Sequence, residues 1–170
     1  MITMTTAAFL RHAARAGSPV GLCTSRVRTY GSEVVTRRID GAAARTLDGL
    51  FAAFAAAWDF PAHFGANKDA FDDCIRDLSP RLHTPTGAPA HGYLTVVENG
   101  PELLAAAHDR DFRWFATSIG FYRDSYRDDP DHPRGFSLVL LCPPEEADAV
   151  RERWEDAGVR VVTVHDRRGV

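Results

Sequence analysis

The chain has 170 residues and a mass of 18.7 kDa, which suffices for one domain with a sizeable core and is too little for two large ones. Hydrophobic residues make up 45% of the chain and charged residues 25%, a composition that excludes a disordered chain, a collagen and a coiled coil. No apolar run approaches the roughly 20 residues that cross a bilayer, and residues 1–17 lack the pattern of a secretory signal. The widely spaced Cys23, Cys74 and Cys142 are typical of reduced thiols, so we expect a cytoplasmic protein.

Charge differs between two parts of the chain. Residues 1–38 carry six arginines against one acidic residue, Glu33, which gives them a charge of +5 and leaves −8 for residues 39–170. A net-acidic body argues against a nucleic-acid-binding protein, which usually displays a basic stripe. It favours a basic protein partner, because opposite fields speed the encounter of two proteins.

Hydrophobic periodicity and turn residues predict alternating helices and strands. In chain order we expect a helix over 5–16, strands over 20–28 and 33–39, a helix that begins after Thr46 and includes Trp58, a helix over 67–78, a strand over 93–97, a helical stretch over 103–122, a strand over 136–142, a helix over 143–156 and a strand over 159–164. Strands separated by helices favour an α/β fold with a mainly parallel sheet. The sequence has no glycine-rich phosphate loop, so a nucleotide-dependent enzyme is not expected.

The predicted helix over 67–78 has an unusual surface composition. One stripe is apolar, and the opposite side is acidic; the two sets are Ala70, Phe71, Cys74, Ile75 and Leu78, and Asp69, Asp72, Asp73 and Asp77. Aspartate is a poor helix former away from the first turn, and like charges three or four residues apart repel. A solvated helix face is one explanation, although such a face more often uses glutamate and lysine. We expect the Cys74 side chain to pack in the core.

The loop before this helix and the helix itself carry a family resemblance. Residues 60–75 have the sequence Phe60-Pro61-Ala62-His63-Phe64-Gly65-Ala66-Asn67-Lys68-Asp69-Ala70-Phe71-Asp72-Asp73-Cys74-Ile75. This segment closely resembles the barstar family of intracellular ribonuclease inhibitors, whose signature is Pro-x-x-aromatic-Gly-x-Asn-x-Asp-Ala-x-x-Asp-Cys. The match extends over about residues 35–78, and the order of elements agrees as far as the strand at 136–142.

The resemblance implies a fold and a domain organisation. We expect an α/β fold with a small parallel sheet packed against helices, in a barstar-like domain over residues 35–170. Residues 1–34 are then an N-terminal extension, and the last helix and strand are an extra C-terminal unit. Because the resemblance lies downstream of the extension, we expect that deleting residues 1–34 leaves a folded protein.

The resemblance also implies a binding site for a basic ribonuclease or toxin nuclease. Asp73 matches the family's central aspartate, which occupies the substrate phosphate site, and Asp69 matches a second interface aspartate. Two positions where the family often has aromatic residues are His63 and Asp72, and Leu78 stands at a third. The predicted partner-binding residues are His63, Asn67, Lys68, Asp69, Asp72, Asp73 and Asp77. No catalytic residue, metal or cofactor is expected.

Other functions stay open. A barstar-like binding module could meet a different toxin nuclease or a regulatory protein. A metal-dependent phosphoesterase using Asp69 and Asp73 is a further alternative, as is nucleic-acid binding by the N-terminal arginines. The acidic loop over 128–132 could hold a divalent metal, but it lacks the spacing of a calcium loop, and a solvated loop is the simpler interpretation. Stoichiometric inhibition without turnover would separate an inhibitor from an enzyme.

Overall fold

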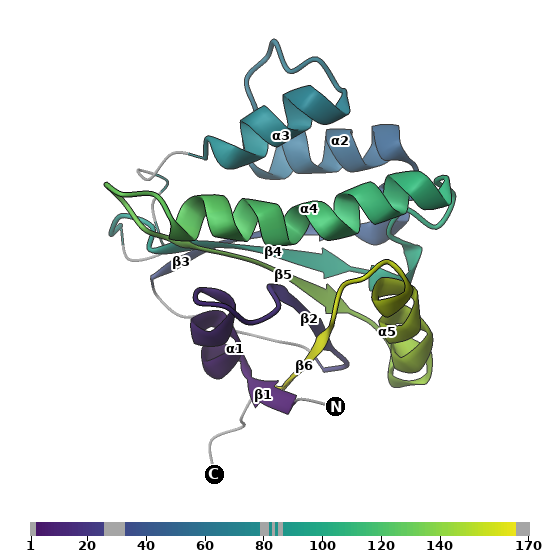
Figure 1. Ribbon diagram of the computed structural model, residues 1–170. Coiled ribbons are helices and arrows are strands. Elements are labelled where there is room, and N and C mark those ends of the chain that lie inside the picture. Colours follow the sequence, from purple (N-terminus) through teal and green to yellow (C-terminus); the bar gives the residue numbers. More distant parts are fainter. Residues whose placement is uncertain (1–2, 26–32, 79–81, 83, 85–86, 166–170) are drawn as a thin grey trace.

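The structure, a computed structural model, describes residues 3–25, 33–78, 82, 84 and 87–165. Its strands are β1 (Thr3–Thr5), β2 (Val20–Cys23), β3 (Val34–Asp40), β4 (Gly92–Glu98), β5 (Gly135–Leu141) and β6 (Val162–His165). Its α-helices are α1 (Thr6–Ala13), α2 (Leu47–Ala57), α3 (Lys68–Arg76), α4 (Asp109–Arg127) and α5 (Ala147–Asp156). The strands form one parallel sheet in the order β1-β6-β2-β5-β4-β3, which confirms the predicted α/β fold (Figure 1).

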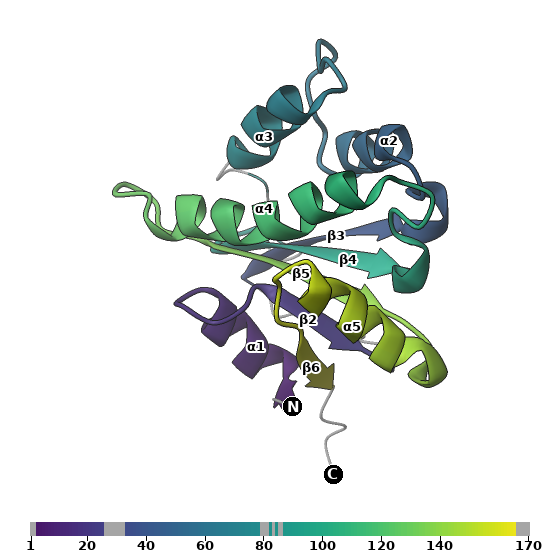
Figure 2. The same cartoon turned by 45° about the vertical axis from the view of Figure 1, so that its right-hand side comes forward.

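The helices cover the two faces of this sheet unequally. α2, α4 and α5 contribute to a large core on one face, and α1 contributes to a smaller core on the other. Strand residues alternate between the two cores: on β4, Tyr93 and Val97 belong to the large core, and Leu94 and Val96 to the small one. α3 lies farther from the sheet, against α2 and α4 (Figure 2). This arrangement places one side of α3 at the surface of the molecule.

The N-terminal segment contributes to the same sheet. β2 lies between β5 and β6, and β1 extends the sheet beyond β6. Arg123 of α4 is buried and donates hydrogen bonds to the backbone oxygens of Ala13 (3.0 Å), the last residue of α1, and of Gly17 in the turn that follows. A guanidinium there satisfies carbonyls that the helix leaves unpaired. Deletion of residues 1–34 would expose edges of β5 and β6, so the topology disfavours the expectation that this segment is dispensable.

Most predicted elements are confirmed to within a few residues, and the differences have physical reasons. β1 was not predicted because three residues are too few to show an alternation. The helical stretch expected from residue 103 begins only at Asp109, because Pro101 opens a 3-10 turn and Leu104 has a left-handed backbone with φ of 55°. Leu103 and Leu104 are buried directly after that turn. They are apolar because they pack in the core, and they do not belong to the helix. The predicted strand residues 26–28 lie outside the described residues.

No helix in the described ranges is both long enough and apolar enough to cross a membrane.

Candidate partner-binding surface

α3 begins where the sequence predicts it. The Asn67 side chain caps the helix, because its Oδ1 accepts a hydrogen bond from the backbone N–H of Ala70 at 2.8 Å. Asp69 lies in the first turn, where a carboxylate interacts favourably with the positive end of the helix dipole. Ala66 precedes the cap with a φ of 48°, a left-handed conformation that turns the chain into the helix. Asn67 therefore has a structural role, whatever else it contacts.

Aromatic packing fixes the inner side of α3. Phe71 and Ile75 are fully buried. The ring centroid of Phe71 lies 5.3 Å from that of Phe54 on α2 and 5.7 Å from that of Trp114 on α4. Such ring pairs contribute about 0.5–1.5 kcal/mol beyond the burial of their area. Phe71 thus packs α3 against two neighbouring helices at once.

The loop between α2 and α3 is held at its base and exposed at its tip. Phe60 and Phe64 are half-buried, with ring centroids 5.2 Å apart, and the Phe60 ring lies 5.9 Å from that of Phe71. Between them Pro61 and His63 are exposed, and the loop projects beyond α3 at the top of Figure 1. His63 is therefore an exposed side chain of the loop that leads into α3, where a partner can reach it.

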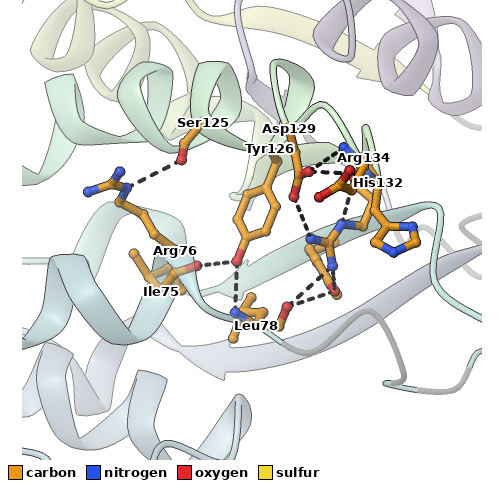
Figure 3. Close-up of polar contacts among 10 residues, drawn as sticks. Ile75, Arg76, Leu78, Ser125, Tyr126, Asp129, His132 and Arg134 are labelled. Carbon is orange, nitrogen blue, oxygen red and sulfur yellow. Dashed lines mark hydrogen bonds and ion pairs between the residues drawn. The ribbon is translucent and has the colours of Figure 1, made fainter.

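Tyr126 of α4 clamps the C-terminal end of α3 (Figure 3). Its hydroxyl donates a hydrogen bond to the Ile75 backbone oxygen at 2.6 Å and accepts one from the Leu78 backbone N–H at 2.9 Å. All three residues are buried. Burial raises the pKa of the Tyr126 phenol above its usual range, so the hydroxyl stays protonated and keeps donating. Two backbone groups at the end of α3 thus depend on one side chain of α4.

Arg134 extends this clamp toward the sheet. Its guanidinium donates to the Leu78 backbone oxygen at 3.3 Å and to the Tyr93 hydroxyl at 2.8 Å. Asp129 pairs with Arg134 at 3.4 Å and accepts hydrogen bonds from the backbone N–H groups of Asp131 and His132, which lower the pKa of its carboxyl (Figure 3). The described part of the acidic loop therefore organises the backbone after α4. Within the described ranges, no three His, Cys, Asp or Glu side chains are grouped as a metal site.

Lys68 and Asp72 turn toward α4. Lys68 Nζ donates to Asp111 Oδ1 at 2.7 Å and lies 5.2 Å from the centroid of the Trp114 ring, and the bond lowers the pKa of Asp111. Asp72 is half-buried and accepts a hydrogen bond from the Tyr122 hydroxyl. The prediction that Asp72 lies on the outward side is therefore wrong, because the packing of Phe71 and Ile75 rotates Asp72 toward the neighbouring helix.

Asp69, Asp73 and Asp77 remain exposed, and we name these three residues the acidic stripe. They are spaced four residues apart, so their carboxylates lie on one side of the helix. Within the described ranges, none of them has an ion-pair partner within 4.0 Å. Asp77 is the C-cap residue, where a negative charge opposes the helix dipole. The stripe therefore concentrates unpaired negative charge on the exposed side of a helix whose opposite side packs against α2 and α4.

Cys74 lies between the buried and the exposed sides of α3 and not in the core. It is half-buried, because the inward direction of α3 is set by Phe71, Ile75 and Leu78, and Cys74 falls beside that line. The expectation that its side chain packs in the core is wrong to this extent. Burial, with help from the charges of Asp73 and Asp77, raises the pKa of the Cys74 thiol, so the reactive thiolate is disfavoured.

Sequence reasoning missed one neighbour of this surface, Phe121. The Arg76 guanidinium lies 4.8 Å from the centroid of the Phe121 ring on α4, and its Nε donates to Ser125 Oγ at 3.3 Å. Phe121 falls outside the buried stripe of α4, which includes Phe115, Ile119 and Tyr122. That mismatch in helical spacing was the available signal for an exposed aromatic residue.

Comparisons with known proteins agree with this geometry. No match was found among curated proteins. The family model described as Barstar (barnase inhibitor) matches residues 34–139, a range that contains β3, α2, α3, β4, α4 and most of β5. Because this match covers more than half of the chain and includes the loop, the helix and the acidic stripe, the chain belongs to the barstar family.

Proposed function

We propose that the chain inhibits a basic ribonuclease by placing the acidic stripe of α3 in the active-site cleft of the enzyme. Barstar-family proteins are inhibitors rather than enzymes, and the family implies a ribonuclease as partner. The observation that carries the proposal is the combination of three exposed carboxylates without ion-pair partners in the described ranges and a helix fixed on its opposite side. Such a surface is poor for stability and suited to a cationic partner.

The chemistry of a ribonuclease cleft supports the proposal. A cleft that binds a phosphodiester presents cationic side chains, and a carboxylate accepts paired hydrogen bonds from an arginine much as a phosphate does. Asp73 lies at the centre of the stripe, so we assign it to the phosphate-binding position, with Asp69 and Asp77 on either side. His63 and Asn67 flank the stripe at its N-terminal end and would meet the rim of the cleft.

The anchoring of α3 supports tight binding. The cap at Asn67, the ring of Phe71 and the hydroxyl of Tyr126 hold the helix before a partner arrives. Little conformational entropy is then lost on association. Lys68 and Asp72 are engaged with α4, so we propose that they position the helix and touch the partner only at its edge.

A second candidate is a different target, such as a toxin nuclease or a regulatory protein. It is favoured by the loss of aromatic side chains at two positions where the resemblance implies them and by a smaller ring at a third. His63 has a smaller ring, Asp72 is an acid bonded to Tyr122, and Leu78 is buried against the clamp. Aromatic anchors commonly dominate binding energy, so their loss alters which partner fits.

Inhibition of a purified ribonuclease tests the proposal. We expect the chain to abolish cleavage of an RNA substrate by barnase at one equivalent, with no cleavage of phosphoesters by the chain alone. A linear titration with a sharp end point indicates a stoichiometric inhibitor. Full ribonuclease activity in the presence of excess chain would contradict the proposed function.

A further inference from the structure

Phe121 is the large apolar side chain that the described part of the chain leaves exposed. It lies on α4 with 53% of its surface accessible, whereas its neighbours Tyr122 and Ile119 are buried. A single exposed aromatic residue is ordinary in a soluble protein, so its exposure alone carries no conclusion. A role for Phe121 is indicated by its contact with Arg76, next to the acidic stripe.

Arg76 joins Phe121 to α3. The Arg76 guanidinium lies over the Phe121 ring, 4.8 Å from its centroid, and its Nε bonds Ser125 on the same helix. Arg76 is the last residue of α3; it lies three residues after Asp73 and directly before Asp77, the C-cap. Arg76 therefore links the Phe121 ring of α4 to the C-terminal end of the helix that carries the stripe.

The stacking of Arg76 also preserves the charge of the stripe. Arg76 follows Asp73 by three residues, a spacing at which opposite charges on a helix pair. In the structure Arg76 points instead to Phe121 and Ser125, and no ion pair joins it to Asp73 among the described residues. The contacts with Phe121 and Ser125 thus engage a cation that helical spacing would allow to pair with Asp73.

We propose that Phe121 is the aromatic anchor of the partner-binding surface, which extends from α3 onto α4. The occupant is the ribonuclease of the proposed function, on which this inference rests, and it would present an apolar contact at the rim of its basic cleft. Charge complementarity at the stripe brings the two proteins together, and the ring then excludes water at the edge of the contact. The acidic stripe itself contains no apolar anchor, so Phe121 supplies the kind of side chain it lacks.

Binding kinetics with barnase as the probe test this assignment. An apolar anchor acts on the dissociation rate, and screened charges act on the association rate. We expect Phe121→Ala to raise Kd about tenfold or more, mainly through faster dissociation. Phe121→Leu, which keeps part of the apolar area, should lose less. Because Phe121 is exposed and its contact with Arg76 is a weak surface interaction, the melting temperature of both variants should stay within about 4 °C of that of the parent chain.

Matched variants separate the possible outcomes. Glu152→Ala on α5, an exposed position distant from α3 in both ribbon views, is the control and should bind as the parent does. If Asp73→Ala binds weakly and Phe121→Ala binds normally, the inhibitor proposal stands and the anchor assignment is wrong. If the parent chain does not bind barnase, both fail. The parent chain could instead form a homodimer that dissociates in Phe121→Ala while nuclease binding is unaffected. That result would assign the ring to a contact with a second copy of the chain and overturn the inference.

Discussion

Tyr126→Phe should destabilise the protein although it removes a single oxygen atom. The hydroxyl bonds the Ile75 oxygen and the Leu78 N–H, and both partners lie in residues that are at most 5% exposed. Without the hydroxyl both backbone groups lose a partner in a place that water reaches poorly. Leaving a buried polar group unpaired costs about 1–3 kcal/mol, so for two groups we expect a loss of about 2–6 kcal/mol in the free energy of unfolding.

Urea denaturation followed by circular dichroism measures this loss, provided that the slope of the transition is unchanged. Tyr122→Phe is the matched control: it removes a hydrogen bond to Asp72, which is half-buried and open to hydration, so about 1 kcal/mol should be lost. Hydrogen exchange should quicken most at the end of α3 in Tyr126→Phe. A Tyr126→Phe variant as stable as the parent, within about 0.5 kcal/mol, would show that the Tyr126 hydroxyl does not stabilise the end of α3.

Three further predictions concern the helix start, the sheet and pH. Asn67→Ala should cost about 1 kcal/mol in urea denaturation by removing the cap of α3, whereas Asn67→Asp should keep it. Deleting residues 1–25 removes β2 from between β5 and β6, so size-exclusion chromatography should show aggregate; a soluble, folded monomer would contradict this topology. Burial raises the pKa of Tyr93, Tyr122 and Tyr126, and raises that of Cys142 to about 11. The raised pKa values mean that the folded state favours the neutral forms of these groups. Their contribution to the free energy of unfolding should therefore be complete below about pH 9 and be lost as the pH rises further. A urea midpoint that stays constant up to about pH 11 would contradict this.

The outward side of α3 was predictable because it depends on local patterns. Asn67 is a good capping residue, and the spacing of Phe71, Ile75 and Leu78 fixes the inward direction, so the exposure of Asp73 follows from helix geometry alone. The position of Asp72 did not follow, because it is decided by the Tyr122 hydroxyl, 50 residues farther along the chain. Local periodicity contains no information about such a partner.

The order of the sheet was also beyond the sequence patterns. A continuous apolar strand such as β5 indicates burial on both faces, but not which strands flank it. That β2 pairs with β5 depends on contacts between Val20 and Leu138, which are far apart in the chain. The buried Arg123, which bonds the end of α1, was indistinguishable in the sequence from the exposed arginines.

The affinity of Asp73→Ala for barnase, measured beside its stability, tests most directly whether the acidic stripe is the inhibitory surface. Asp73 is exposed and is repelled by Asp69 and Asp77, so its removal should leave the free energy of unfolding within about 0.5 kcal/mol or raise it slightly. Binding should weaken by about 2–5 kcal/mol or more, the usual cost of truncating one member of a buried interfacial charge pair. Asp77→Ala, at the end of the helix, should lose much less. If Asp73→Ala binds barnase as tightly as the parent chain, the acidic stripe is not the inhibitory surface.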